Sequence, residues 1–283
     1  MLRVGVIGCG GMGRDHIRRL TEKIQGAEVV AVSDVFEESA RKAAEICGAK
    51  VYADSKELIN AENVDAVFIV SPGFAHVDSL LQAIEAGKRI FCEKPLCTTA
   101  EDCLKVVKAE EAAGKHLIQL GFMRRYDKGY QQIKEALATG EYGEPLILHC
   151  THRNPEVGTN YNTPMAVHDT AIHEIDVLHW LVDDEYESAQ VVMPKVTKYS
   201  HSELKDPQIM MLRTKKGVCI DVEVFVNCKF GYDINCEVVC EDGALKMAQP
   251  AYPSIRKNAA VSTAIDTAVS YTHLRAHETL RHL

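Results

Sequence analysis

The stretch VGVIGCGGMG at positions 4–13 decides the fold of this chain. Its first four residues predict a short buried strand, and its last six fit the pattern G-x-G-x-x-G. In that pattern Gly8 permits a tight turn, Gly10 lets the backbone approach a ligand, and Gly13 lets the next helix pack on the sheet. Between a strand and a helix the pattern indicates a dinucleotide site, because the first amides of the helix attract a pyrophosphate.

A carboxylate further along the chain fits the same site. A second apolar segment at 29–32 leads to Asp34. An acidic side chain about 20 residues beyond the glycine turn can accept hydrogen bonds from the ribose hydroxyls of adenosine. It would also repel a 2′-phosphate, so the sequence favours NAD over NADP. The alternative is a glycine-rich turn in a domain that binds no nucleotide.

The first 121 residues alternate short apolar segments with amphipathic ones. The apolar segments predict strands at 4–7, 29–32, 66–70, 89–92 and 116–120. The amphipathic segments predict helices at 14–24, 37–46, 77–86 and 100–113. Continuous apolar strands covered by helices on both faces are typical of a parallel sheet. We therefore expect an α/β protein whose N-terminal domain, residues 1–121, is a doubly wound Rossmann sheet.

Residues 122–267 indicate a second domain of α+β type. A helix is expected from about Asp169 to Leu181, and residues 220–226 alternate apolar and polar side chains. The segments 215–217 and 241–243 have the composition of hairpin turns. These signals predict a largely antiparallel open sheet with one face on a core. Its other face carries Cys219 and Phe225 among charges, so a partner subunit could cover it.

Length and composition narrow the class of protein. At about 150 residues per domain, 283 residues predict two domains. A hydrophobic share of 46% with 25% charged residues excludes a disordered, collagen-like or coiled-coil protein. A net charge of −8 argues against a nucleic-acid scaffold, which needs a basic face. We expect no membrane span, because no apolar run approaches the roughly 18 residues required, and no signal peptide.

The ten cysteines include no Cys-x-x-Cys pair, and several lie in apolar segments. Buried free thiols are therefore favoured over a disulfide framework, which indicates the cytoplasm. The last residues, 268–283, carry His273, His277 and His282. They are either a metal-binding tract or, as we prefer, a foreign read-through tail outside both domains.

Two further segments follow predicted strands, at the edge where such sheets bind ligands. Residues 71–76 follow the strand at 66–70, and Glu93-Lys94-Pro95 follows the strand at 89–92. Pro95 restricts the backbone of Lys94 to extended conformations, which would fix the start of its side chain. The alternative for Lys94 is an ordinary surface lysine.

Asp169, His173 and Asp176 are spaced i, i+4 and i+7, which places them on one face of a helix. A carboxylate one turn from an imidazole can orient it and stabilise its charged form. A histidine so placed suits the removal of a hydroxyl proton near neutral pH. The alternatives are a capping Asp169 with a core His173, or a metal site that adds His149 or His152. The two latter residues should point to opposite faces of a strand, so we predict no metal.

Taken together, these segments resemble the glucose–fructose oxidoreductase / inositol dehydrogenase / rhizopine catabolism family. The resemblance runs from residue 1 to about residue 257 and is strongest to the inositol dehydrogenases of bacteria. Beyond the glycine turn, Glu93-Lys94-Pro95 and the Asp169–His173 pair, it rests on the segments 91–96, 121–127, 152–155, 177–181 and 227–233.

The resemblance implies oxidation of myo-inositol to 2-keto-myo-inositol (scyllo-inosose) with NAD. It implies that His173 takes the C2 hydroxyl proton, that Asp169 orients His173, and that Lys94 hydrogen-bonds the reacting oxygen. It implies a polyol pocket of Arg124, His152, Asn154, Asp176 and Tyr232. The NAD site would comprise Gly8, Gly10, Gly11, Met12, Gly13, Asp34, Ser71, Pro72, His76, Glu93 and Lys94. The second domain would mediate a homo-oligomer, often a tetramer, and Tyr232 lies in a segment that in relatives reaches a neighbouring subunit's site.

The chain departs from this family at its end. Relatives continue well beyond residue 265 with segments that pack back on both domains. In this chain we expect the foreign tail, residues 268–283, to stand in their place. We therefore expect a truncated, destabilised and weakly active chain. Three other functions stay open at this point: a dehydrogenase of another polyol or sugar, a non-catalytic NAD sensor, and an NAD-assisted glycoside hydrolase.

Overall fold

The structure, a computed structural model, describes residues 1–247. They divide into two compact units, residues 1–122 and 123–247, which we call the first and the second unit. The expectations for residues 248–283, including the foreign tail, lie outside the described residues. None of the helices in residues 1–247 is long and apolar enough to cross a bilayer.

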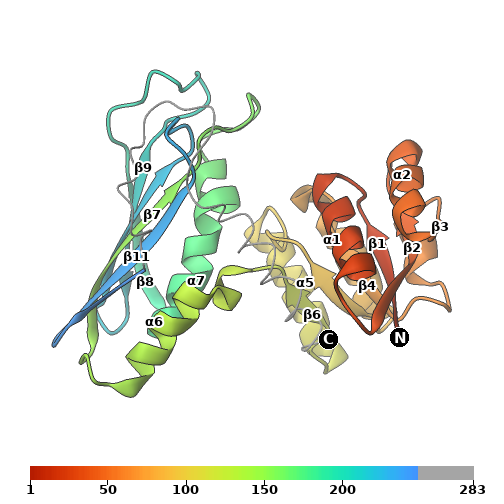
Figure 1. The fold of residues 1–283 in the computed structure, drawn as a ribbon, viewed down its shortest axis with the longest axis horizontal. Coiled ribbons are helices and arrows are strands. Elements are labelled where there is room, and N and C mark those ends of the chain that lie inside the picture. The colour runs from red at the N-terminus through yellow and green to blue at the C-terminus, as the bar shows by residue number, and fades with distance from the viewer. Residues whose placement is uncertain (248–283) are drawn as a thin grey trace. The chain divides into compact units, whose positions relative to one another are not determined.

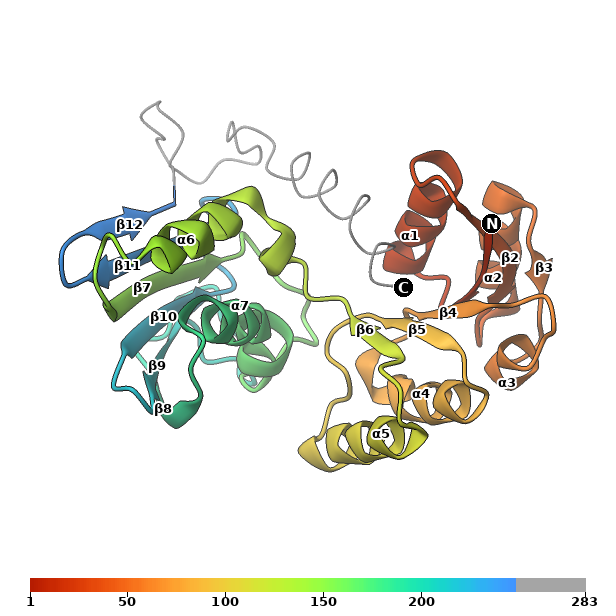
Figure 2. The ribbon, with the colours of Figure 1, turned by 90° about the horizontal axis from the view of Figure 1, so that it is seen from below.

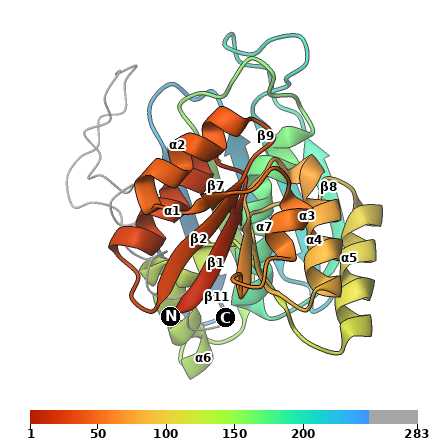
Figure 3. The same ribbon diagram turned by 90° about the vertical axis from the view of Figure 1, so that its right-hand side faces the viewer.

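The first unit is a six-stranded parallel sheet in the order β3-β2-β1-β4-β5-β6, which is the Rossmann order. Its strands are β1 Leu2–Ile7, β2 Ala27–Ser33, β3 Lys50–Val51, β4 Ala66–Ile69, β5 Arg89–Cys92 and β6 Ile118–Leu120. Its helices are α1 Gly11–Glu22, α2 Glu37–Cys47, α3 Ser55–Ile59, α4 His76–Glu85 and α5 Ala100–Ala113. Helices α1 and α2 cover one face and α3, α4 and α5 the other (Figure 3). The predicted doubly wound sheet is confirmed.

Local sequence signals explain where these helices begin and end. The Thr99 hydroxyl accepts the Asp102 N–H at 3.1 Å and caps α5, which ends at Gly114 with a φ of 64°. Helix α2 starts with two glutamates in its first turn and ends at Gly48, whose φ is 72°. Acidic side chains favour a helix start, and glycine takes the left-handed conformation at a helix end without strain.

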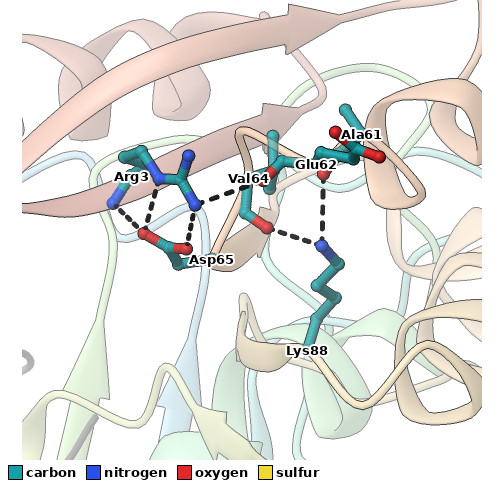
Figure 4. Close-up of polar contacts among 6 residues, drawn as sticks. All are labelled: Arg3, Ala61, Glu62, Val64, Asp65 and Lys88. Carbon is teal, nitrogen blue, oxygen red and sulfur yellow. Dashed lines mark hydrogen bonds and ion pairs between the residues drawn. The ribbon is translucent and has the colours of Figure 1, made fainter.

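Polar contacts fix the edge of the first sheet at which β1 and β4 begin (Figure 4). The Arg3 guanidinium donates to both carboxylate oxygens of Asp65, at 2.6 and 3.0 Å. The Lys88 ammonium donates to the backbone oxygens of Val64 and Ala61, at 2.5 and 3.3 Å. These contacts hold the segment before β4, and they lie at the edge opposite the glycine turn, which follows β1.

The second unit is a six-stranded sheet in the order β12-β11-β7-β10-β9-β8, with only the β7–β10 pair parallel. Its strands are β7 Pro145–Arg153, β8 Tyr186–Val192, β9 Gln208–Thr214, β10 Cys219–Phe225, β11 Asp233–Cys240 and β12 Ala244–Lys246. Its helices α6 Lys128–Thr139 and α7 Ile172–Val182 lie on one face of the sheet (Figures 1 and 2). The predicted, largely antiparallel open sheet is confirmed, as are the hairpin turns at 215–217 and 241–243.

Alternation along β10 gives the second sheet two unlike faces. Ile220, Val222 and Val224 are buried in the core with α6 and α7. Cys219 is exposed on the other face, as predicted, together with Met211 of β9. All ten cysteines are free thiols in the structure.

The helix expected from Asp169 differs in detail from the observed one. The α-helix starts only at Ile172, and the preceding residues Ala166–Ala171 form a π-helical turn. In such a turn each residue advances by less rotation than in an α-helix, so the i, i+4, i+7 spacing does not by itself place Asp169 on the face of His173 and Asp176.

Candidate functional site

The glycine turn between β1 and α1 is shaped by close contacts that only glycine permits. A Cβ on Gly8, whose φ is 93°, would lie 2.4 Å from the Ser71 nitrogen, and a Cβ on Gly13 would lie 1.9 Å from the Gly8 oxygen. By contrast, a Cβ on Gly10 or Gly11 would meet no described atom within 4 Å. The turn is therefore tightly packed on its inner side and open on its outer side, where side chains would obstruct a ligand.

The start of α1 suits an anionic ligand. It has no side-chain cap and no acidic residue in its first turn. Its first amides and its dipole can therefore attract a phosphate. Met12 is exposed beside them. The residues present fit the pyrophosphate of a dinucleotide.

Asp34 lies beside this turn, as the spacing predicted. Its Oδ2 accepts the Cys9 N–H at 2.6 Å, and its Oδ1 accepts the Phe36 N–H at 2.8 Å. Burial and the nearby Asp34 carboxylate raise the pKa of the Cys9 thiol to about 12. The thiol is therefore neutral and adds no negative charge beside the Asp34 carboxylate.

His76 connects the two segments expected at the ligand edge. It is fully buried, with Nε2 2.7 Å from the Ser71 oxygen and Nδ1 2.9 Å from the Pro95 oxygen. Pro72 begins the 3-10 turn between Ser71 and His76. Because the imidazole has no exposed surface, it can act on a cofactor only through the backbone of these two segments.

Glu93 anchors the segment that carries Lys94. Its Oε1 lies 2.8 Å from Nε2 of His16, and both side chains are buried. Its Oε2 accepts the Lys94 N–H at 3.2 Å. The pair thus ties the backbone of Lys94, which precedes a cis peptide bond to Pro95, to helix α1. His16 was not foreseen from the sequence.

In the second unit, four of the predicted polar residues lie together. The His152 ring contacts the rings of His173 and Tyr232, with centroids 6.2 and 6.1 Å away. Arg124 Nη2 lies 3.2 Å from Nδ1 of His152. Arg124, His152 and His173 are all at most 7% exposed. These donors and acceptors are suited to a small polar ligand rather than an apolar one.

Glu174 completes this cluster and was missed in the sequence. It is fully buried, with its two oxygens 2.8 Å from Arg124 Nη2 and 2.7 Å from His152 Nδ1. The available signal was its position in α7, one turn before Leu178 on the apolar face, where an unpaired glutamate would be costly.

The remaining predicted residues have other contacts. Asp169 Oδ1 lies 2.7 Å from Nδ1 of the adjacent His168. Asp176 accepts hydrogen bonds from Arg125, whose Nε is 2.9 Å away. The Asn154 backbone joins β10 to the segment before β11 through Phe225 and Cys228, at 2.9 and 3.0 Å. Within residues 1–247 no group of three or more histidine, cysteine or acidic side chains could hold a metal ion.

The fold and the glycine turn define a dinucleotide-binding protein with a second α+β unit. Residues 2–122 match the model of the "Oxidoreductase family, NAD-binding Rossmann fold", and residues 130–246 match the "GFO/IDH/MocA C-terminal domain". The chain belongs to the glucose–fructose oxidoreductase / inositol dehydrogenase / rhizopine catabolism family.

Several members of this family are similar to the chain over most of its length. The chain is 51% identical over 279 residues to an inositol 2-dehydrogenase of Klebsiella pneumoniae. The aligned region covers 98% of this chain and 83% of the relative. It is 55% identical over 257 residues to an "Inositol 2-dehydrogenase/D-chiro-inositol 3-dehydrogenase" of Shouchella clausii, covering 90% and 74%. A crystal structure of myo-inositol dehydrogenase from Lactobacillus casei with NAD(H) and myo-inositol matches with a TM-score of 0.91 and 44% identity, covering 98% and 83%.

Proposed function

We propose that this protein oxidises the C2 hydroxyl of myo-inositol to a ketone, giving 2-keto-myo-inositol, with NAD as the oxidant. The observation that carries the proposal is the 51% identity with an inositol 2-dehydrogenase across 98% of the chain. The open side of the glycine turn and the adjacent Asp34 support NAD as the cofactor. When bound, NAD accepts the hydride that leaves the carbon atom.

The protein's own residues handle the proton and the substrate. His173 accepts the hydroxyl proton, and Asp169 orients His173. Lys94, whose backbone is held by the His16–Glu93 pair, donates a hydrogen bond to the reacting oxygen. Arg124, His152, Asn154, Asp176 and Tyr232 bind the other hydroxyls. Gly8, Gly10, Gly11, Met12, Gly13, Asp34, Ser71, Pro72 and Glu93 surround the cofactor, and His76 supports them from beneath.

The test is NADH formation, followed by absorbance, with purified protein, NAD and myo-inositol. His173→Ala should lower kcat by about 10²–10⁴-fold, the usual contribution of a general base. His179→Ala is the matched control, because His179 is on the same helix and exposed. Binding of NAD without NADH formation from any inositol isomer would contradict the proposal and favour a non-catalytic sensor.

D-chiro-inositol is a second candidate substrate. The Shouchella clausii relative, 55% identical, carries both activities in its name. The same assay with D-chiro-inositol in place of myo-inositol tests this. NADH formation from glucose but from neither inositol would point instead to a sugar dehydrogenase.

We also propose that the protein is a cytoplasmic homotetramer. Ten free thiols suit a reducing compartment. The outer face of the second sheet carries the exposed apolar side chains Ile147 and Met211, which a partner subunit could bury. Light scattering tests the assembly, and Met211→Glu should weaken it. A monomer at high protein concentration would contradict it.

A further inference from the structure

Glu174 has no role in the proposed reaction so far, although it touches two of the residues expected to bind the substrate. We propose that Glu174 is a positioning residue that fixes His152 in one tautomer, so that His152 accepts a hydrogen bond from a substrate hydroxyl. The part that concerns the substrate rests on the proposed function. The part that concerns the tautomer does not.

The contacts of Glu174 leave little freedom to either partner. Its carboxylate is fully buried, and His152 and Arg124 are each 4% exposed. One oxygen lies 2.7 Å from His152 Nδ1, and the other lies 2.8 Å from Arg124 Nη2. The contact with His152 is a hydrogen bond of the short, charge-assisted kind, whereas the contact with Arg124 is an ion pair in which Glu174 Oε1 accepts no hydrogen bond. The three side chains come from α7, β7 and the turn before α6, so they hold separate elements together.

The hydrogen-bond chemistry decides which nitrogen of His152 carries the proton. An ionised carboxylate can only accept, so an unprotonated Nδ1 at 2.7 Å would place two lone pairs against each other. Nδ1 must therefore donate to Glu174. In the neutral ring, Nε2 is then unprotonated and can only accept.

Arg124 Nη2 also lies near Nδ1 of His152, at 3.2 Å, and could in principle donate to it. That contact is longer than the one between Nδ1 and the carboxylate, and Arg124 Nη2 already has Glu174 Oε1 at 2.8 Å. A doubly protonated His152 would place two cations against one carboxylate in a buried cluster, which is unfavourable. In the neutral ring with a proton on Nδ1, that N–H donates to Glu174 Oε2, and Glu174 Oε1 keeps its ion pair with Arg124.

This arrangement has a consequence for substrate choice. The His152 ring stands next to the ring of His173, with 6.2 Å between centroids, and is nearly perpendicular to the Tyr232 ring, with 6.1 Å between centroids. An accepting Nε2 there favours a hydroxyl, which can donate, over a carbonyl or an ether oxygen, which cannot. The tautomer set by Glu174 would thus favour polyols with a free hydroxyl at one defined position.

The first test reads the tautomer directly in the substrate-free protein. Two-bond ¹H–¹⁵N correlation spectra of histidine-labelled protein distinguish the two tautomers, and His152→Gln assigns the signals of His152. We expect a protonated Nδ1 in the wild type. In Glu174→Gln, the amide oxygen would face Arg124 and the amide NH₂ would donate to Nδ1, so the proton should move to Nε2. A wild-type His152 ring with its proton on Nε2 would overturn the proposal, whether or not Glu174→Gln folds.

The second test measures function. Glu174→Gln should lower kcat/KM for myo-inositol about tenfold, because Nε2 would then donate to the substrate hydroxyl and the proton of that hydroxyl would lose its acceptor. The dissociation constant for NAD should change less than twofold. Glu185→Gln is the matched control, because Glu185 pairs with exposed His179 just after the same helix. A reversed tautomer with unchanged kcat/KM would refute the substrate part, and the expected tautomer in a protein that oxidises no polyol would refute the proposed function instead.

Discussion

Three of the carboxylates at the candidate sites each contact two different nitrogen groups through their two oxygens. The oxygens of Asp34 accept two backbone N–H groups, those of Glu93 face an imidazole and a backbone N–H, and those of Glu174 face an imidazole and a guanidinium. A carboxylate held at both oxygens keeps its orientation before a ligand arrives, which lowers the entropic cost of binding. At the scale of single residues, these acidic side chains therefore fix the conformation of both sites before a ligand binds.

The substitution Asp34→Ser tests the role of such a carboxylate at the nucleotide site. Loss of the carboxylate should raise KM for NAD at least about tenfold, because one charge-assisted hydrogen bond is typically equivalent to 1.5–3 kcal/mol. It should raise kcat/KM for NADP, because the repulsion of a 2′-phosphate disappears. Initial rates with both cofactors measure the change. Asp54→Ser is the control, since Asp54 caps α3 and serine is an equally good cap. An unchanged preference for NAD would show that Asp34 only holds the turn.

At the scale of elements, helix α5 shows what the sequence could predict. Its predicted bounds, residues 100–113, are confirmed, because a capping threonine and a terminal glycine act through local hydrogen bonds and φ angles. The π-helical turn before α7 could not be predicted in this way, because apolar periodicity does not distinguish i+5 from i+4 hydrogen bonding. Glu174 was missed for a related reason: its partners are 22 and 50 residues away and meet it only in the folded chain.

At the same scale, the ion pair between Arg3 of β1 and Asp65 before β4 leads to a prediction about how stability depends on pH. The Arg3 guanidinium holds the pKa of Asp65 well below its ordinary value of 3.8. A lowered folded-state pKa stabilises the fold above the unfolded-state value, and that stabilisation is lost as pH falls from about 4 towards the folded-state pKa. Asp65→Asn should therefore lower the melting temperature modestly at pH 6 and much less near pH 2. Salt should reduce the difference at pH 6, because the pair is partly exposed. An equal effect at both pH values would contradict the ion-pair explanation.

At the scale of the whole molecule, the two sheets bury their faces differently. Within residues 1–247, the first sheet has a hydrophobic core on each face, and the second has one core, between its inner face and helices α6 and α7. Each unit thus encloses cores made of its own residues. Two units with separate cores can unfold as separate cooperative transitions, and a ligand raises the stability of the unit that binds it.

Two matched substitutions assign these transitions. Leu80 and Leu148 are both fully buried, the first in the first unit and the second in the second unit. Each substitution should lower the free energy of unfolding of its own unit by about 2–5 kcal/mol, as expected for a cavity in a core. In a calorimetric scan, Leu80→Ala and Leu148→Ala should therefore lower the midpoint temperatures of two different transitions. NAD at about 100 times its dissociation constant should raise the free energy of unfolding of the first unit, which contains Leu80, by about 2.7 kcal/mol. The transition of the second unit, which contains Leu148, should stay unchanged. If both substitutions and NAD moved one common transition, the two cores would unfold as a single cooperative body, and nucleotide binding would stabilise the polyol-binding unit as well.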